Sequence, residues 1–562
     1  MSEQPDMGEE IHDLVHAFAD GELEPAEADA FRVHLGTCEQ CQAELNDILQ
    51  LQALSGRLAS TQTQASSASA PPAQELRPSQ ASRPAEEASS RAFRPAWSRR
   101  RRTALTLVLG GSLAAAFALA VLREPGPGAG KPEALALAPT RSLEARLSYG
   151  GASTWRPYNV KRSGTERALE MVPLEKLAKL EKAGDYHGMG ASYLLRGERE
   201  QAAEFLTRAA ASVDVDSDRA VLAFSKGSLN EALQLLEGVL EKAPNHAPAL
   251  WNRGLVLREL GLDLLAAESF GKVVALNEAG WSDEARERKV ALENPVLERR
   301  NRWKAARDAG KALVEQGTPM PESAVRDAPP VARRSLYLAV GSAPTAERVL
   351  ALRPVAQALD AHYGARVLEP SLERIAKRDF TKRAPLAATF AQLVAGKLEA
   401  SEGEGFLRQL QASGENDLLL SALPLLQQLP ARWELYASAA REEGDPWFLM
   451  DVERQHALAQ RAASEPAKAE ATLRSALTTC EQQRLDARCA ELHQLLAELY
   501  AAERRWPEAR EHTQRALAWA RQVNDVELES GLLRTLGQLA GLQGASALER
   551  AYLQEAQLRQ PG

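Results

Sequence analysis

The sequence predicts an all-α protein in which a small domain of three to four helices is joined by one transmembrane helix to a long helical-repeat solenoid. Ala, Leu, Glu, Gln and Arg dominate the chain and aromatic residues make up only 5% of it, a balance that favours helix over sheet. An uncharged stretch, 103–122, separates two more polar regions. After this stretch, small and bulky residues recur at regular intervals, which indicates helical repeats.

The composition excludes several classes of protein. With 44% hydrophobic and 26% charged residues, the chain of 562 residues is not a wholly disordered protein. Its formal net charge of −8 argues against direct binding of nucleic acid. Four cysteines are too few for a disulfide scaffold of this length. The length itself predicts several domain-sized units.

Residues 1–58 form the predicted small domain. Apolar residues recur at helical spacing from Ile11 to Phe18, and further helices are expected over 27–34 and 42–58. Up to residue 57, this domain carries 13 acidic side chains against only two arginines, a net charge of −11. It is therefore expected to be helical and strongly acidic.

Residues 59–98 form a predicted disordered linker rich in Ser, Ala and Pro. From residue 61 onward, most positions are occupied by Ser, Thr, Ala, Pro or Gln. Such a segment has almost no aliphatic side chains to bury, so it is expected to stay extended and solvated.

The predicted transmembrane helix, with its flanks, covers residues 99–123. As a helix, residues 103–122 extend about 30 Å, the thickness of the hydrocarbon core of a bilayer. Four arginines stand immediately before them: Arg99, Arg100, Arg101 and Arg102. Because a basic flank stays in the cytoplasm, we expect the chain before the span to be cytoplasmic and the chain after it to lie across the membrane. A buried Ala-rich core helix is the alternative interpretation.

The chain after the span is predicted to begin with an extracytoplasmic linker, 124–165, followed by repeats over 166–295. These repeats resemble tetratricopeptide repeats. Ala232 in one unit recurs as Ala266 in the next, and Gly254 stands where two helices are expected to cross closely. Small residues at such crossings are a packing requirement, so these positions are expected to be structural.

The remaining repeats are less regular. Residues 296–450 are expected to be helical with degenerate repeats, and the repeat pattern returns over 451–560 with a longer interval, as between Ala469 and Ala509. The resemblance to tetratricopeptide repeats implies a protein or peptide ligand on the concave surface of the array.

The chemistry of the small domain lies in the motif His34-x3-Cys38-x2-Cys41. One helical turn brings His34 beside Cys38, and the next brings Cys41. Imidazole and thiolate are good ligands for zinc, and a tetrahedral site needs one more donor. We expect one zinc ion that stabilises a domain with a thin core. The alternative is that the two cysteines are a helix–turn pair without a metal.

The fourth zinc ligand is expected from the first helix. His12 and His16 lie on one face of this helix, at positions i and i+4. We choose His12 over His16 as the fourth ligand.

The motif resembles the zinc-binding anti-sigma factor family. The resemblance rests on the sequence FADGEL at 18–23, a short helix, and the zinc motif at 34–41, and it covers about residues 8–55. It implies a small helical domain that clamps an extracytoplasmic-function sigma factor and blocks its binding to RNA polymerase core. The family usually places its first-helix ligand around Gly8 and Glu9, where this chain has neither Cys nor His.

The surface of the small domain fits a sigma factor as partner. The acidic domain complements the basic surfaces of such a protein, and this charge would steer the encounter. The apolar side chains of Leu45, Ile48 and Leu49 are expected to enter a groove of the partner.

Taken together, these features predict a membrane-anchored anti-sigma factor of the bacterial inner membrane. It has a cytoplasmic N-terminus, a single membrane pass, and an extracytoplasmic repeat array that senses or scaffolds. Signal transfer is expected through regulated proteolysis near the membrane, as the family resemblance suggests, or through altered helix association. The alternative is a membrane-tethered scaffold protein of the cell envelope with a zinc-stabilised docking domain.

The sequence does not indicate an enzyme. Cys480, Cys489 and His493 fall inside predicted repeat helices, with no catalytic loop around them. Buried packing is the first interpretation of these cysteines. A disulfide between Cys480 and Cys489 is the second, if this part of the chain lies outside the cytoplasm.

Overall fold

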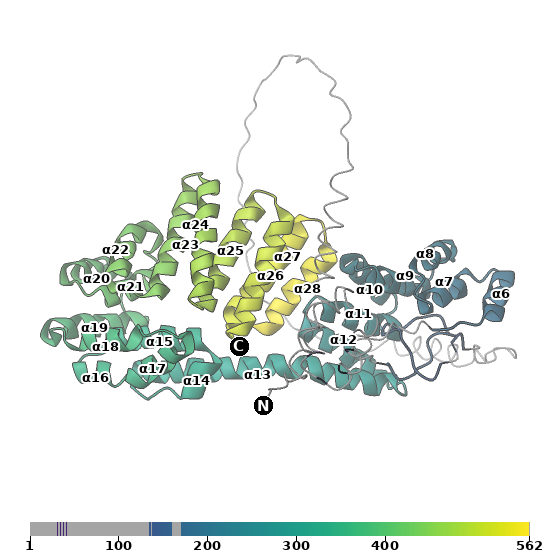
Figure 1. The fold of residues 1–562 in the computed structure, drawn as a ribbon, viewed down its shortest axis with the longest axis horizontal. Coiled ribbons are helices and arrows are strands. Elements are labelled where there is room, and N and C mark those ends of the chain that lie inside the picture. Colours follow the sequence, from purple (N-terminus) through teal and green to yellow (C-terminus); the bar gives the residue numbers. More distant parts are fainter. Residues whose placement is uncertain are drawn as a thin grey trace, which may run out of the picture. The chain divides into compact units, whose positions relative to one another are not determined.

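The structure is a computed structural model that describes residues 31, 34, 38, 41, 134–136, 138–159 and 170–560. The chain divides into two compact units, Met1–Ala115 and Ala116–Gly562. In the described part of the second unit the secondary structure is helical, apart from one isolated bridge between Arg141 and Tyr158 (Figure 1). The predicted all-α class is confirmed for this unit.

Among its described residues, the second unit has these helices, in chain order: α6 (Leu174–Ala183), α7 (Tyr186–Leu195), α8 (Arg199–Arg208), α9 (Val213–Ser225), α10 (Leu229–Lys242), α11 (Ala247–Glu259), α12 (Asp263–Ala275), α13 (Trp281–Glu315), α14 (Glu322–Asp327), α15 (Pro329–Gly341), α16 (Ala346–Leu350), α17 (Arg353–Tyr363), α18 (Leu368–Ala376), α19 (Phe380–Val394), α20 (Ala400–Ser413), α21 (Asn416–Leu425), η1 (Pro430–Arg432), α22 (Trp433–Glu443), α23 (Pro446–Ala462), α24 (Pro466–Gln482), α25 (Asp486–Ala502), α26 (Trp506–Gln522), α27 (Val526–Leu542) and α28 (Ser546–Arg559).

Neighbouring helices stack as antiparallel pairs, and in the first pairs a glycine allows the two helices to cross closely (Figure 1). A Cβ atom at Gly254 of α11 would lie 2.8 Å from the ring of Phe270 on α12, and one at Gly190 of α7 would lie 2.7 Å from Leu206 on α8. The turn between α11 and α12 places Gly261 at φ +70°, a conformation that only glycine adopts without strain. The close crossing predicted at Gly254 is present.

The last six helices repeat with a strict interval. Their first residues are evenly spaced along the chain, namely Pro446, Pro466, Asp486, Trp506, Val526 and Ser546. Helices α23 to α27 each have 17 residues. The turns between them each contain one residue with positive φ, namely Ser464, Arg484, Arg504, Asn524 and Gly544. Two helices and two turns therefore make one repeat unit, and this unit has the interval that the sequence predicted from Ala469 and Ala509.

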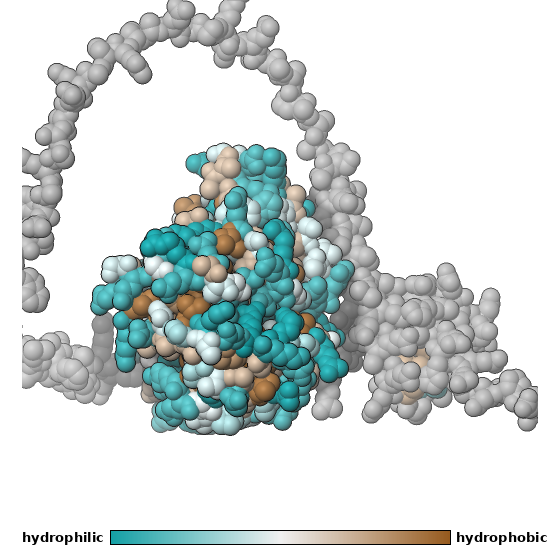
Figure 2. Space-filling model, turned by 90° about the vertical axis from the view of Figure 1, so that its left-hand side faces the viewer, coloured by the Kyte–Doolittle hydropathy of each residue, from teal (hydrophilic) through white to brown (hydrophobic). Residues whose placement is uncertain are grey.

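The longest of the described helices, α13, connects the early helices, α6–α12, to the later helices, α14–α28. Its 35 residues run without a break through Pro295, so the boundary expected after residue 295 falls inside one helix. Trp281 at its start and Trp303 further along are both buried, and this burial holds the helix to its neighbours on both sides of the proline. Residues 296–450 are helical, as expected. At the end of the second unit that contains α16–α22, the visible surface is mainly hydrophilic, with small scattered hydrophobic groups (Figure 2).

The last helices pack back against the early ones. Helix α28 contacts α10 and α12, and α27 contacts α13. Leu236 and Val256 from the early helices share one hydrophobic core with Leu533 and Ala551 from the last two. Residues far apart in the sequence therefore stabilise each other by burying apolar surface.

A buried ionic cluster fixes this contact. Arg559 at the end of α28 donates from Nε to Glu555 at 2.6 Å and pairs with Glu529 of α27 and with Asp263 of α12. The Glu555 carboxylate in turn accepts hydrogen bonds from the backbone N–H groups of Leu264 and Leu265, at 3.1 and 2.9 Å. These N–H groups belong to the first turn of α12, which has no partner within its own helix, so α28 caps α12.

The described residues of the predicted linker 124–165 are packed against helices. Leu135, Ala145 and Leu147 are buried in one hydrophobic core with residues of α6–α13. Apolar side chains and hydrogen bonds to distant helices hold this segment, and neither leaves a repeating pattern in the sequence. Within the range that the sequence assigned to a linker, these residues thus contribute to a hydrophobic core of the second unit.

A disulfide bond joins Cys480 at the end of α24 to Cys489 near the start of α25. The two Cα atoms lie 5.7 Å apart and both side chains are fully buried. Of the two interpretations left open by the sequence, buried packing and a disulfide, the structure has both.

The predicted transmembrane helix and its arginine flank, residues 99–123, lie outside the described residues. In the part of the chain that the structure describes, each helix is too short or too polar to cross a membrane.

We expect Arg559→Met to destabilise the second unit strongly. The substitution leaves the buried carboxylate of Glu555 without its cation and removes one of the arginines that pair with Glu529, which costs about 3–5 kcal/mol of unfolding free energy. Urea denaturation of the full chain in detergent measures this loss. The matched control is Arg550→Met, whose arginine is 54% exposed on the same helix and pairs with Glu237. It should cost less than about 1 kcal/mol. Equal losses from the two variants would contradict the closing role of Arg559.

Candidate metal centre

The three predicted zinc ligands of the first unit stand at the junction of helical and non-helical backbone. His34 and Cys41 are helical, and Cys38 between them is not. The backbone N–H of Cys38 donates to the carbonyl of His34 at 3.0 Å, which continues the helical turn up to this residue. Spacings of four and three residues then bring all three side chains to one side of the backbone.

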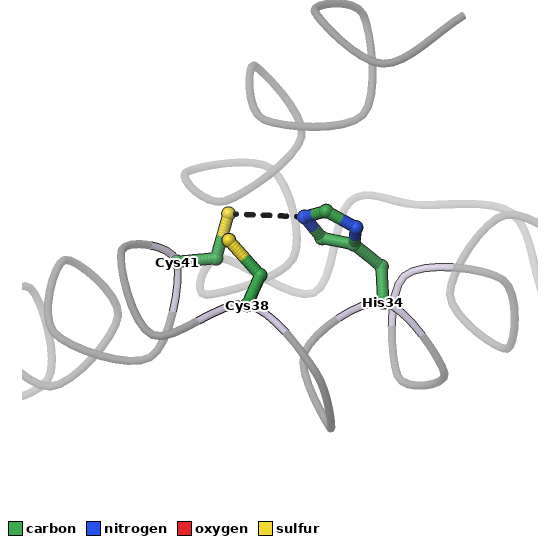
Figure 3. A group of neighbouring side chains, drawn as sticks. All are labelled: His34, Cys38 and Cys41. Atoms are coloured by element: carbon green, nitrogen blue, oxygen red, sulfur yellow. Dashed lines mark hydrogen bonds between the residues drawn. The ribbon is translucent and has the colours of Figure 1, made fainter.

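The donor atoms of these side chains converge (Figure 3). The Sγ of Cys41 lies 3.5 Å from Nε2 of His34, and the three donor atoms, one from each residue, all lie within 4.8 Å of one another. Around a tetrahedral zinc ion, sulfur and nitrogen ligands are separated by about 3.5–3.8 Å. The arrangement of His34, Cys38 and Cys41 therefore fits zinc, with one position left for a fourth donor.

Burial around the cluster favours a structural role for a bound metal. Cys41 is 1% exposed, whereas His34 and Cys38 are partly exposed. Phe31, one turn before His34, is fully buried, and its ring centroid lies 6.1 Å from that of the imidazole. Phe31 was not among the candidate site residues, although its position three residues before His34 places it on the same helix face. A zinc ion here would link the donor side chains and so stabilise a domain too small for a large core.

Several predicted site residues lie outside the described residues. These are the fourth-ligand candidates and the predicted sigma-binding residues, namely His12, His16, Leu45, Ile48 and Leu49. The structure thus brings together three of the four predicted ligands.

Comparison with known proteins supports a zinc-binding role. Residues 9–42 match the sequence profile of a family whose description reads "Putative zinc-finger". This family is typical of anti-sigma factors. The match contains His34, Cys38 and Cys41, and also both histidines considered for the fourth position. No curated protein matches the chain.

We expect the purified full chain to bind about one equivalent of zinc, measured by elemental analysis. The double variant Cys38→Ser, Cys41→Ser should lose it, because the remaining nitrogen donors bind zinc far more weakly. His12→Ala should also lower the zinc content, whereas His16→Ala should retain it. The matched control replaces the other two cysteines, Cys480→Ser with Cys489→Ser, and should leave the zinc content unchanged. Full zinc occupancy in the Cys38→Ser, Cys41→Ser variant would refute this ligand set.

Proposed function

We propose that the protein is a membrane-anchored anti-sigma factor. In this proposal residues 1–58 sequester an extracytoplasmic-function sigma factor in the cytoplasm, and the helical array of the second unit senses or scaffolds across the membrane. The observation that carries the proposal is the convergence of His34, Cys38 and Cys41 within a match to a family typical of anti-sigma factors.

The composition of the first unit supports a sigma factor as the partner. The net charge of −11 up to residue 57 complements a partner with basic surfaces and speeds their association. Leu45, Ile48 and Leu49 recur at helical spacing and supply apolar side chains for a groove of the partner. In this proposal the zinc ion holds the domain in the conformation that presents these side chains.

The proposed membrane anchor is the segment 103–122. It carries no charged side chain and follows the arginines at 99–102. The basic flank places the first unit in the cytoplasm and the second unit across the inner membrane. The chain thereby connects an extracytoplasmic event to a cytoplasmic domain.

The disulfide of the second unit supports this topology. Cys480 and Cys489 are bonded to each other, whereas Cys38 and Cys41 have metal-ligand spacing and converge with His34. Disulfides persist in oxidising compartments and are rare in the cytoplasm. The two cysteine pairs therefore fit opposite sides of a membrane.

The helical array supplies a surface for recognition. Antiparallel helix pairs and the close crossing at Gly254 support a tetratricopeptide-like array. Such arrays bind proteins or peptides on an extended surface, and a ligand bound there is the proposed signal.

We expect Cys480 and Cys489 to form their disulfide bond in cells. If cells are denatured directly in an alkylating reagent, intact-mass analysis should show two alkylated thiols, those of Cys38 and Cys41, and four after prior reduction. The control Cys480→Ser with Cys489→Ser should show two alkylated thiols with or without reduction. Four alkylated thiols without reduction would contradict an extracytoplasmic second unit.

We expect the full chain, solubilised from membranes, to capture one sigma factor from the cells that produce it. The variant Cys38→Ser, Cys41→Ser should recover at least ten-fold less of it, because the metal-stabilised domain is lost. Arg550→Met, an exposed substitution in the second unit, is the matched control and should capture a normal amount. Mass spectrometry identifies and quantifies the captured protein.

Capture of no sigma factor by the zinc-loaded full chain would refute this function and favour the envelope scaffold. If the full chain does capture a sigma factor, Ile48→Asp serves as a local probe of the contact surface. It should weaken the capture of the sigma factor without changing the zinc content.

A further inference from the structure

The segment 138–159 lies on the helices of the second unit without forming a helix or a sheet with them. Its one regular feature is the isolated bridge between Arg141 and Tyr158. Its middle part, 141–149, runs across α9, α11 and α13, and its hydrogen bonds with these three helices come from side chains 69 to 144 residues further along the chain. We call the helix surface under this part the docking face. Its main residues are Asp218, Trp251, Asn252, Arg258, Glu278 and Glu284.

The docking face binds the backbone of the segment. The side-chain amide of Asn252 accepts from the N–H of Arg146 at 2.8 Å and donates to the carbonyl of the same residue at 2.7 Å. Trp251 donates from its indole Nε1 to the carbonyl of Glu144 at 3.0 Å. Asn252 is 3% exposed, and a buried amide is costly unless both of its groups are paired. Asn252 is therefore well suited to hold an extended backbone of any sequence.

A buried carboxylate extends this backbone recognition. Asp218 of α9 is fully buried and accepts from the N–H groups of Ser148 and Tyr149, at 2.6 and 3.4 Å. His187 of α7 holds the second oxygen of this carboxylate at 2.8 Å. Burial lowers the pKa of His187, but the hydrogen bond and charge of Asp218 outweigh burial and raise this pKa above its ordinary value. The N–H groups of two successive residues are thus bound by one carboxylate, whose orientation is fixed by His187.

Charged side chains on the docking face select the sequence of the segment. Arg141 forms two hydrogen bonds with Glu284, at 2.7 and 3.2 Å. Arg146 pairs with Glu278, and both guanidinium groups lie 4.6 Å from the ring centroid of Trp281.

Between the two arginines, the docking face receives a carboxylate. Glu144 accepts from Arg258 at 2.6 and 2.8 Å and also pairs with Arg288. Burial raises the pKa of Glu144, but these two arginines outweigh burial and lower it to about 2. The docking face therefore recognises the pattern Arg-x2-Glu-x-Arg, in which each charged side chain of the occupant meets the opposite charge.

The segment leaves a pocket of about 200 Å³ beside Leu143, which is lined by Leu194, Leu195 and Val221. Ala145 and Leu147 of the segment are buried in a core shared with the helices. A peptide that copies the segment brings the same apolar side chains, ion pairs and backbone hydrogen bonds, so it can replace each of these contacts.

From these contacts we propose that the docking face is a binding site for an extended peptide of a partner protein with the pattern Arg-x2-Glu-x-Arg, and that residues 141–149 are a built-in occupant displaced by that peptide. The proposal rests on contacts within the second unit and does not depend on the anti-sigma function. A tethered occupant competes at an effective concentration on the order of millimolar. A free peptide therefore binds well only when the tethered segment is weakened or when the peptide fits better.

The test uses the full chain in detergent and a fluorescent synthetic peptide that copies residues 139–151. In fluorescence anisotropy, the variant Arg141→Ala with Arg146→Ala should bind this peptide at least ten-fold more tightly than the unmodified chain does. Adding Asn252→Leu to that variant should abolish the gain. The matched control is Arg286→Ala, an exposed arginine of α13 that pairs with Asp283 of its own helix, and it should bind like the unmodified chain.

The peptide itself provides a second control. We call the variant Arg141→Ala with Arg146→Ala the opened variant. A peptide with Glu in place of both arginines should bind the opened variant at least ten-fold more weakly than the original peptide does, because its negative charges face Glu278 and Glu284. Equal affinity of the unmodified chain and the opened variant, or equal affinity of the two peptides, would overturn the proposal. So would the absence of peptide binding to an opened variant whose circular dichroism shows intact helices.

A measurement on the unmodified chain covers the case in which the opened variant does not fold. Hydrogen–deuterium exchange reports on the backbone N–H groups of Arg146 and Ser148, which the docking face holds. Millimolar peptide should accelerate their exchange at least ten-fold, while the charge-reversed peptide leaves it unchanged. Unchanged exchange with both peptides would show that 141–149 is a permanent part of the fold and would overturn the proposal.

Discussion

The second unit depends on the contact by which its last helices close against its early ones. A linear array of helix pairs leaves apolar surface exposed at its ends unless something covers it. Here α28 covers α10 and α12, and Arg559 neutralises three carboxylates at the centre of this contact. One of them, that of Glu555, caps the first turn of α12. The early helices are thus held in place by residues from the far end of the sequence.

Helix α11 connects this closing contact to the docking face. Its Val256 and Leu257 are buried in the core shared with α26–α28, whereas its Trp251 and Leu255 are buried in the core that contains residues of the segment 135–147. Replacing the occupant of the docking face therefore acts on a helix that also packs against the end of the chain. Because packed helices shift as rigid bodies, such a replacement has a route to the rest of the array.

In the proposed function, the segment on the docking face is the stretch of chain that follows the membrane anchor. A peptide that takes its place releases the chain between the anchor and the first helix pair. This gives the proposed sensor a physical basis, since in the proposed topology an extracytoplasmic ligand frees part of the chain that links the second unit to the cytoplasmic domain. The metal centre has a different part in this scheme. In the proposal, a zinc ion at this centre holds the acidic domain together, and the three described donor atoms lie within 4.8 Å of one another.

The sequence by itself determined the helical class, the close crossing at Gly254, the regular interval of the last helices and the grouping of His34, Cys38 and Cys41. These features are local, because helical periodicity and ligand spacing act within one or two turns of the chain. Only the tertiary structure decided the bond between Cys480 and Cys489, the closing contact at Arg559 and the place of residues 141–149. Each of these depends on side chains that meet through folding, and a single arginine, asparagine or aspartate in a helix carries no sign of its distant partner. The docking face was hidden for this reason: Asn252 and Asp218 look like ordinary polar residues of a helix until the segment that they hold is in place.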